Sequence, residues 1–334
     1  MPFFVGYICY KISIQQSMKI KELLEDSMLL VGCVVGVSFV TGKEAQVFVG
    51  NCQNIVVFAI AFAFCTFVMR KFCTKWQLNS TQQFVQFAFE KGGNFLHFAM
   101  LLCYFVCMVT TLATVQNSLQ QLVGNLSFPL WSAVVVIASA WVQKMGTKAF
   151  KALSALAFAG AFVTFLLVAS NGHSQQTGRT SPLATLLYSL FSATMALPIC
   201  CKMKGNSTKQ NAICVMFATV VVSLLLWWVE KIADFNLQLP IGGKLTGGGK
   251  ICMCVTVALC GVLGTVANAL PICEDIADVI ADEKLLRFVV FALAWAFSCF
   301  GLDVLLKYGY LFVAVVGLVI VVICLKNKKS PLPR

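Results

Sequence analysis

A carboxylate at the end of an apolar stretch is the first candidate for chemistry in this sequence. Glu44 closes the run GCVVGVSFVTGKE, which begins at Gly32. An ionisable side chain in such surroundings is costly to keep and is commonly found where protons or charged ligands bind. We expect Glu44 to carry a proton or to pair with a cationic ligand. The alternative is that it forms a local pair with Lys43 or lies in an outer vestibule.

Small and hydroxyl-bearing residues accompany this carboxylate and recur in a second apolar segment. The first segment contains Gly36, Ser38, Thr41 and Gly42, and the second, SPLATLLYSLFSATMALPICC, contains Ser189, Ser192, Thr194 and Pro198. Glycine loosens a helix, and proline removes a backbone donor and so frees a carbonyl. Both segments could therefore present backbone groups to a small ligand. Close helix packing is the alternative, because Gly32-x-x-x-Gly36 is a small-xxx-small spacing.

Other chemistry is not indicated. The chain has 16 cysteines and two histidines, and its tight cysteine pairs, Cys200-Cys201 and Cys252-x-Cys254, have no histidine or second pair at metal-ligand spacing. Nucleotide-binding, zinc-protease and hydrolase motifs do not occur. We expect no enzyme activity, no cofactor and no metal beyond a possible sodium ion.

The composition requires a non-aqueous environment for most of the chain. Of the 334 residues, 59% are hydrophobic and only 11% are charged, whereas soluble domains carry about 25% charged residues. The chain is therefore expected to be an all-α polytopic membrane protein whose main partner is the lipid bilayer.

The hydropathy pattern predicts ten membrane spans. A bilayer core of about 30 Å needs roughly 20 apolar residues in a helix. The expected spans are 28–49, 54–70, 94–116, 128–143, 149–170, 183–201, 211–229, 251–272, 286–304 and 308–325.

The basic residues predict how these spans are oriented. With the N-terminus in the cytoplasm, nineteen of the 25 Lys and Arg residues fall in cytoplasmic segments, as the positive-inside rule requires. Both termini are then cytoplasmic, and the location is the plasma membrane. Because the net charge of +12 is a topology signal, we expect no binding of nucleic acid.

Ten spans permit two bundles of five helices related by an inverted repeat. In such folds the first helix of each half is interrupted near the bilayer midplane. The expected units are a cytoplasmic N-terminal segment, two five-helix repeats and a basic cytoplasmic tail, over residues 1–27, 28–170, 183–325 and 326–334.

The run from Gly32 resembles the opening helix of the YkvI-type membrane proteins, whose pattern is roughly G-x-x-x-G-x-G-F-x-[ST]-G-x-E. The matching residues are Gly32, Gly36, Phe39, Thr41, Gly42 and Glu44, while Ser38 replaces a glycine. Tyr188, Phe191 and GTVAN (264–268) give looser similarity. YkvI-type proteins belong to the amino acid–polyamine–organocation transporter superfamily, which has the LeuT-like five-plus-five fold.

The resemblance implies a binding site at the break in the first helix. The break would run from Val35 to Thr41, and the implied substrate-binding residues are Gly36, Val37, Ser38, Phe39, Thr41 and Gly42, faced by Ser189, Ser192 and Thr194. It also implies a sodium site made by the carbonyls of Gly32 and Val35 and the hydroxyl of Thr265. The family site often has two adjacent hydroxyls where this chain has one, so Na⁺ and H⁺, the latter through Glu44, both remain as coupling ions.

The expected function is secondary active transport of a small solute, an amino acid or related amine, by alternating access. A ligand-sensing receptor subunit of the same fold, without net transport, is the alternative. An enzyme is the weakest hypothesis.

Overall fold

The computed structural model describes residues 22–89, 92–124, 129–170, 180–203, 207–276 and 283–326, and these form helices joined by turns. A first helix covers residues 22–34. The longer helices that follow are α3 (Cys52–Trp76), α5 (Gly93–Val123), α6 (Leu130–Met145), α7 (Thr147–Ser170), α8 (Pro182–Met195), α10 (Thr208–Ile232), α11 (Gly247–Ile276), α12 (Glu283–Ser298) and α14 (Tyr310–Lys326). The short ones are α2 (Val37–Val40), the π-helix η1 (Ala45–Val49), α4 (Thr81–Ala88), α9 (Leu197–Lys202), η2 (Gly242–Lys244), α13 (Leu302–Val304) and η3 (Leu305–Gly309).

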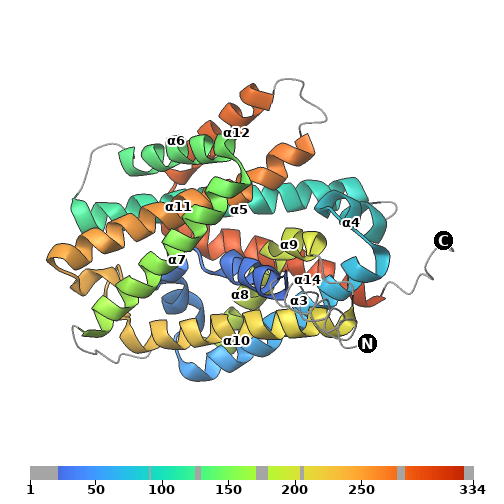
Figure 1. The fold of residues 1–334 in the computed structure, drawn as a ribbon, viewed down its shortest axis with the longest axis horizontal. Coiled ribbons are helices and arrows are strands. Elements are labelled where there is room, and N and C mark those ends of the chain that lie inside the picture. The colour runs from blue at the N-terminus through green and yellow to red at the C-terminus, as the bar shows by residue number, and fades with distance from the viewer. Residues whose placement is uncertain are drawn as a thin grey trace, which may run out of the picture.

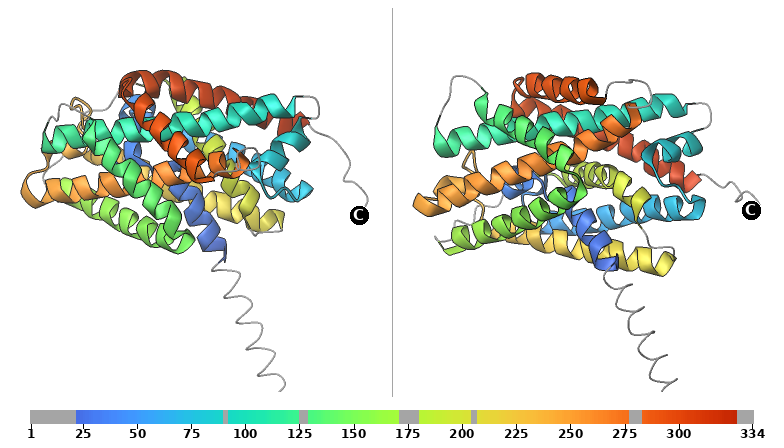
Figure 2. Two further views of the ribbon diagram at one scale, coloured as in Figure 1. Left: turned by 90° about the horizontal axis from the view of Figure 1, so that it is seen from above. Right: turned by 45° about the horizontal axis from the view of Figure 1, so that its top comes forward.

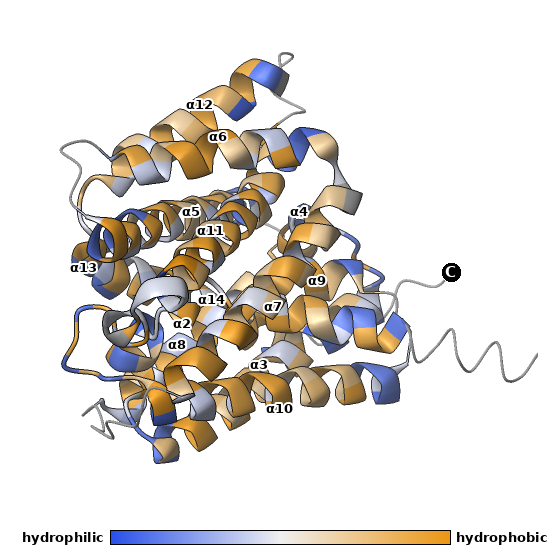
Figure 3. Cartoon of the chain, turned by 60° about the vertical axis from the view of Figure 1, so that its left-hand side comes forward, coloured by the Kyte–Doolittle hydropathy of each residue, from blue (hydrophilic) through white to orange (hydrophobic). Residues whose placement is uncertain are grey.

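Six of the described helices are long and apolar enough to cross a membrane. They cover Cys52–Trp76, Gly93–Val123, Ala152–Ser170, Thr208–Ile232, Gly247–Ile276 and Leu302–Lys326, and α6 and α8 are shorter apolar helices. Apolar residues cover these helices, and polar ones gather towards their ends (Figure 3). The chain is therefore a multi-pass membrane protein, as expected, whereas the number of ten spans stays a prediction.

Polar caps determine where four helices begin. Each cap side chain accepts a hydrogen bond from a backbone N–H two or three residues into its helix, which satisfies a donor that the helix itself leaves free. The caps of α3, α4, α8 and α10 are Asn51, Ser80, Ser181 and Ser207.

The helices pack as two interlocking groups. In one group α11 crosses α5 and α7, and α6 lies beside α12; in the other α3 packs between α8 and α10, and α14 packs on α8 (Figures 1 and 2). A small residue permits the closest approach within the second group, because a methyl group at Gly317 of α14 would overlap Thr194 Oγ1 of α8. The backbone of α14 at Gly317 therefore packs directly against the Thr194 side chain of α8.

Helical structure stops at two places in the part of the chain that contains the candidate residues. Val35 and Gly36 lie between the helix over 22–34 and α2, and Thr41 and Gly42 form a turn after α2. Gly42 has φ +79°, a conformation that favours glycine. In the second segment, a single turn residue, Ala196, separates the end of α8 from the start of α9. Glu44 thus lies between a glycine turn and a π-helix.

Candidate ligand and cation site

The carboxyl group of Glu44 is buried and held by two tyrosines. Its side chain is 4% exposed. Tyr188 donates its hydroxyl to Oε2 and Tyr310 donates its hydroxyl to Oε1, both at 2.6 Å. Among the described residues no Lys or Arg lies within ion-pair distance of this carboxyl group. Glu44 is therefore satisfied by neutral donors, and Lys43 is not its partner.

Aromatic rings enclose this carboxyl group. Phe48 stacks between Tyr188 and Tyr310, with centroid distances of 5.4 and 5.2 Å, and Phe191 stacks on Tyr310 at 3.9 Å. Each of the four rings is less than 9% exposed. An apolar cage of this kind excludes water and strengthens the hydrogen bonds inside it.

Three segments that are far apart in the sequence build this site. Glu44 and Phe48 come from the first segment, Tyr188 and Phe191 from α8, and Tyr310 from the start of α14. Thr185 of α8 also donates its hydroxyl to the backbone oxygen of Phe48 at 2.5 Å. The site therefore joins residues that are up to 266 positions apart in the sequence.

The residues implied around the break are buried beside α5 and a loop. Val37, Ser38 and Phe39 lie in α2 and are buried. The Ser38 hydroxyl is 3.0 Å from the Thr114 hydroxyl of α5, and Thr41 Oγ1 donates to the Ser38 carbonyl at 3.1 Å.

A loop after α10 covers the turn that follows. Ile241 donates its N–H to the Thr41 carbonyl at 3.2 Å. A side chain added at Gly42 would come within 3.1 Å of Pro240 and Ile241. The glycine turn is thus closed on this side.

The hydroxyls of the second segment turn back onto their own helix. Ser189, Ser192 and Thr194 donate to the carbonyl four residues earlier, at 2.7 to 2.9 Å. Thr194 also lies against Gly317, whereas Ser189 is 3.5 Å from the Phe58 carbonyl of α3. Their role as a wall facing the break stays a prediction.

The residues implied for sodium differ in their surroundings. The hydroxyl of Thr265 in α11 is fully buried and has no hydrogen-bond partner. Gly32 is exposed, whereas Val35 and Gly36 are half-buried, and no atom lies within 4 Å of where a side chain would project from either glycine. α11 packs against α2, so the free hydroxyl lies on the helix next to the break. Hydroxyl and carbonyl oxygens are the donor types that a hard cation prefers.

Sequence reasoning missed Tyr310, Phe48 and Thr114. The signal for Tyr310 was a hydroxyl in an apolar run, in a chain with only six tyrosines. It could not be linked to Glu44 because the two residues are 266 positions apart.

A second buried polar cluster lies at the other end of α3. Arg70 is 3% exposed and donates to Asn211 Oδ1 of α10 at 3.0 Å. Its two terminal nitrogens donate to the carbonyls of Cys200 and Met203, at 2.7 and 2.9 Å. These carbonyls belong to the last turn of α9 and its end, where helices leave acceptors unpaired. Arg70 therefore caps α9 and joins it to α3 and α10.

Charged pairs and thiols surround the same end of the molecule. His97 of α5 is 2.8 Å from Asp275 of α11, and Lys202 of α9 is 3.2 Å from Glu274. The thiol of Cys73 in α3 lies 3.6 Å from that of Cys201 in α9, and both are buried.

Comparisons with known proteins give the fold. No protein-family model and no curated protein matches the sequence. The structure is similar to that of MhsT in complex with L-phenylalanine, with a TM-score of 0.59 and 15% identity over 89% of this chain and 87% of that one. The manganese transporter of Eremococcus coleocola, in complex with an aromatic bis-isothiourea substituted compound, gives a TM-score of 0.48 and 13% identity over 94% and 90% of the chains. The likeness to MhsT shows the fold, which is that of LeuT-type transporters.

Proposed function

We propose that this chain, which has the fold of LeuT-type transporters, is a secondary active transporter that moves a small solute by alternating access. The observation that carries the proposal is the buried carboxyl group of Glu44, held by hydroxyls from α8 and α14. A carboxyl group without a cationic partner is costly in an apolar interior, and such groups mark proton or substrate pathways.

The proposed architecture is ten helices in a five-plus-five inverted repeat, with both termini in the cytoplasm. The non-helical Val35 and Gly36, and the junction of α8 and α9 at Ala196, support the interruption of the first and sixth helices. Half-helix ends at such breaks leave backbone donors and acceptors for a ligand. We place the solute beside Gly36, Val37 and Ser38, next to the open space at the glycine.

We propose an amino acid or related amine as the solute and H⁺ or Na⁺ as the coupling ion. Glu44 would carry the proton. The unpartnered hydroxyl of Thr265, with the carbonyls of Gly32 and Val35, would hold sodium. L-Phenylalanine, which was bound to MhsT, is the first solute to test.

The test is uptake of labelled L-phenylalanine and a panel of amino acids and amines into proteoliposomes, under an inward proton gradient or an inward sodium gradient. We expect proton-driven uptake to be lost in Glu44→Gln and kept in Glu25→Gln, an exposed carboxylate on the helix over 22–34. Sodium-driven uptake that is lost in Thr265→Val and kept in Glu44→Gln would identify the other ion.

Uptake that is equal in wild type and Glu44→Gln would contradict the proposed role of Glu44. If no solute is taken up but one of them stabilises the purified protein, the transport proposal fails and a ligand-sensing receptor subunit replaces it.

A further inference from the structure

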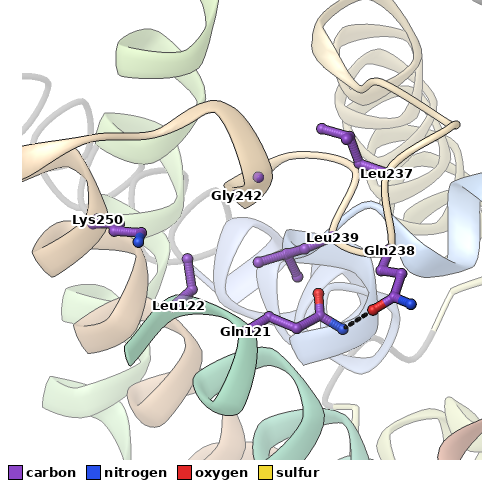
Figure 4. A pocket seen from close by; sticks show the side chains of 8 residues that line it. Gln121, Leu122, Leu237, Gln238, Leu239, Gly242 and Lys250 are labelled. Carbon is purple, nitrogen blue, oxygen red and sulfur yellow. Dashed lines mark hydrogen bonds between the residues drawn. The ribbon is translucent and has the colours of Figure 1, made fainter. Parts of the chain in front are cut away.

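A cavity of about 210 Å³ lies apart from the Glu44 site, at the end of the molecule where α5 ends and α11 begins. Gln121 and Leu122 of α5, Gln238 and Leu239 of the loop after α10, Gly242 of η2 and Lys250 of α11 line it (Figure 4). Pockets for drug-sized ligands measure about 300–1,000 Å³, so this cavity suits a smaller molecule.

The lining combines an apolar floor, two amides and one ammonium group. Leu122 and Leu239 are buried, whereas Lys250 is exposed at the rim. Gln121 Nε2 donates to Asn117 Oδ1 at 2.5 Å and to Gln238 Oε1 at 3.3 Å, so both N–H groups of the Gln121 amide are already used. None of the described residues that line the cavity is acidic. The charge complement is therefore a small anion, and the leucines suit a short hydrocarbon chain.

The loop that forms the cavity also contacts the first segment. On one side it lines the cavity, and on the other Ile241 donates to the Thr41 carbonyl. Gln46 further donates to the carbonyls of Phe235 and Leu237, at 2.5 and 3.4 Å. A ligand in the cavity would bridge this loop to α5 and α11, and so would hold it over the turn next to Glu44.

Close backbone packing gives the cavity its shape. A side chain added at Gly242 would come within 2.5 Å of Leu239 and 3.3 Å of Leu122. The backbone of η2 therefore packs directly on the two leucines.

We propose that this cavity binds a small carboxylate with a short hydrocarbon chain. Lys250 pairs with the carboxylate, and Leu122 and Leu239, which lie between Lys250 and the two amides, contact the chain (Figure 4). Occupation stabilises the arrangement in which the loop covers Thr41. Binding of the carboxylate does not depend on the proposed transport function.

The probe is 4-methylpentanoate, added to the purified full chain while thermal unfolding is followed. We expect a saturable rise in the unfolding temperature of about 3 °C. The matched amide, 4-methylpentanamide, and the matched cation, 3-methylbutylamine, should give no rise, because neither carries the negative charge.

Variants separate this cavity from the rest of the molecule. Lys250→Gln should weaken the apparent affinity for 4-methylpentanoate about tenfold or more, since an ionic hydrogen bond is lost. Lys326→Gln, which changes an exposed lysine at the far end of α14, should leave it unchanged. The ligand-free unfolding temperatures of the variants check that each one folds.

Three outcomes would overturn the proposal. They are the absence of any rise, an equal rise with the amide or the amine, and an equal rise in Lys250→Gln. Loss of the rise in Glu44→Gln, with Lys250→Gln unaffected, would place the probe in the central site. Because the readout is binding, failure of solute uptake leaves this result standing.

Discussion

Individual side chains decide how the buried carboxyl group is satisfied. The sequence predicted Glu44 as an ionisable group in an apolar segment, and that reasoning needs only the local pattern. It also offered Lys43 as a partner, but the structure pairs Glu44 with Tyr188 and Tyr310. Those partners lie in distant segments, so only the packed helices reveal them.

Removing the hydroxyl of Tyr310 tests this arrangement. Tyr310→Phe keeps the ring that stacks on Phe48 and Phe191 but leaves Glu44 with one donor. We expect the free energy of unfolding to fall by about 1.5–3 kcal/mol, the usual range for a hydrogen bond to a charged group. Chemical denaturation in detergent measures it.

Tyr308→Phe is the matched control, because Tyr308 is 60% exposed. It should change the free energy of unfolding by less than about 0.5 kcal/mol. Equal losses in the two variants would show that the Tyr310 hydroxyl does not stabilise Glu44.

The sequence predicts the approximate bounds of a helix better than it predicts which other helices that helix contacts. The expected span over 94–116 is α5 in the structure, and it continues to Val123. Gln116, Asn117 and Gln120 end the apolar pattern, but a helix that reaches water continues through such residues. The contacts of Arg70 could not be foreseen, because a basic residue near the end of a span reads as a topology signal and its acceptors belong to α9.

Because Arg70 caps α9, we expect its substitution to lower the free energy of unfolding strongly. Arg70→Gln removes donors from the Cys200 and Met203 carbonyls and leaves them buried. We expect a loss of about 3 kcal/mol or more in the free energy of unfolding. Arg70→Lys should lose less, because it keeps the charge but lacks the planar fork.

Lys71→Gln changes the next, exposed residue of α3 and should be close to neutral. A large loss in this control, or none in Arg70→Gln, would contradict the assigned role of Arg70.

For the whole molecule, the sequence predicts the class of protein well but not how the helices pack. Composition and hydropathy predicted an all-α multi-pass membrane protein, and the six long apolar helices and the LeuT-type fold bear this out. The order in which helices pack depends on complementary surfaces, such as Gly317 against Thr194, which hydropathy does not encode.

The orientation of the chain can be tested with reporter fusions in a bacterial host. We expect alkaline phosphatase joined after Asn236, in the loop that follows α10, to be active, because the positive-inside rule predicts that this loop lies outside. The same enzyme joined after Lys75, at the end of α3, should be inactive. The reverse pattern would invert the proposed topology.

The neighbouring thiols of Cys73 and Cys201 offer a way to measure how often the contact between α3 and α9 opens. Their sulfurs are 3.6 Å apart, whereas a disulfide bond is about 2.05 Å long. A modest approach would thus suffice to join α3 to α9. Both thiols are buried, so an added oxidant reaches them only when the helices around them separate. The rate of cross-linking would then report how often that end of the molecule opens. The cross-linked protein would be held in one conformation, which favours crystallisation.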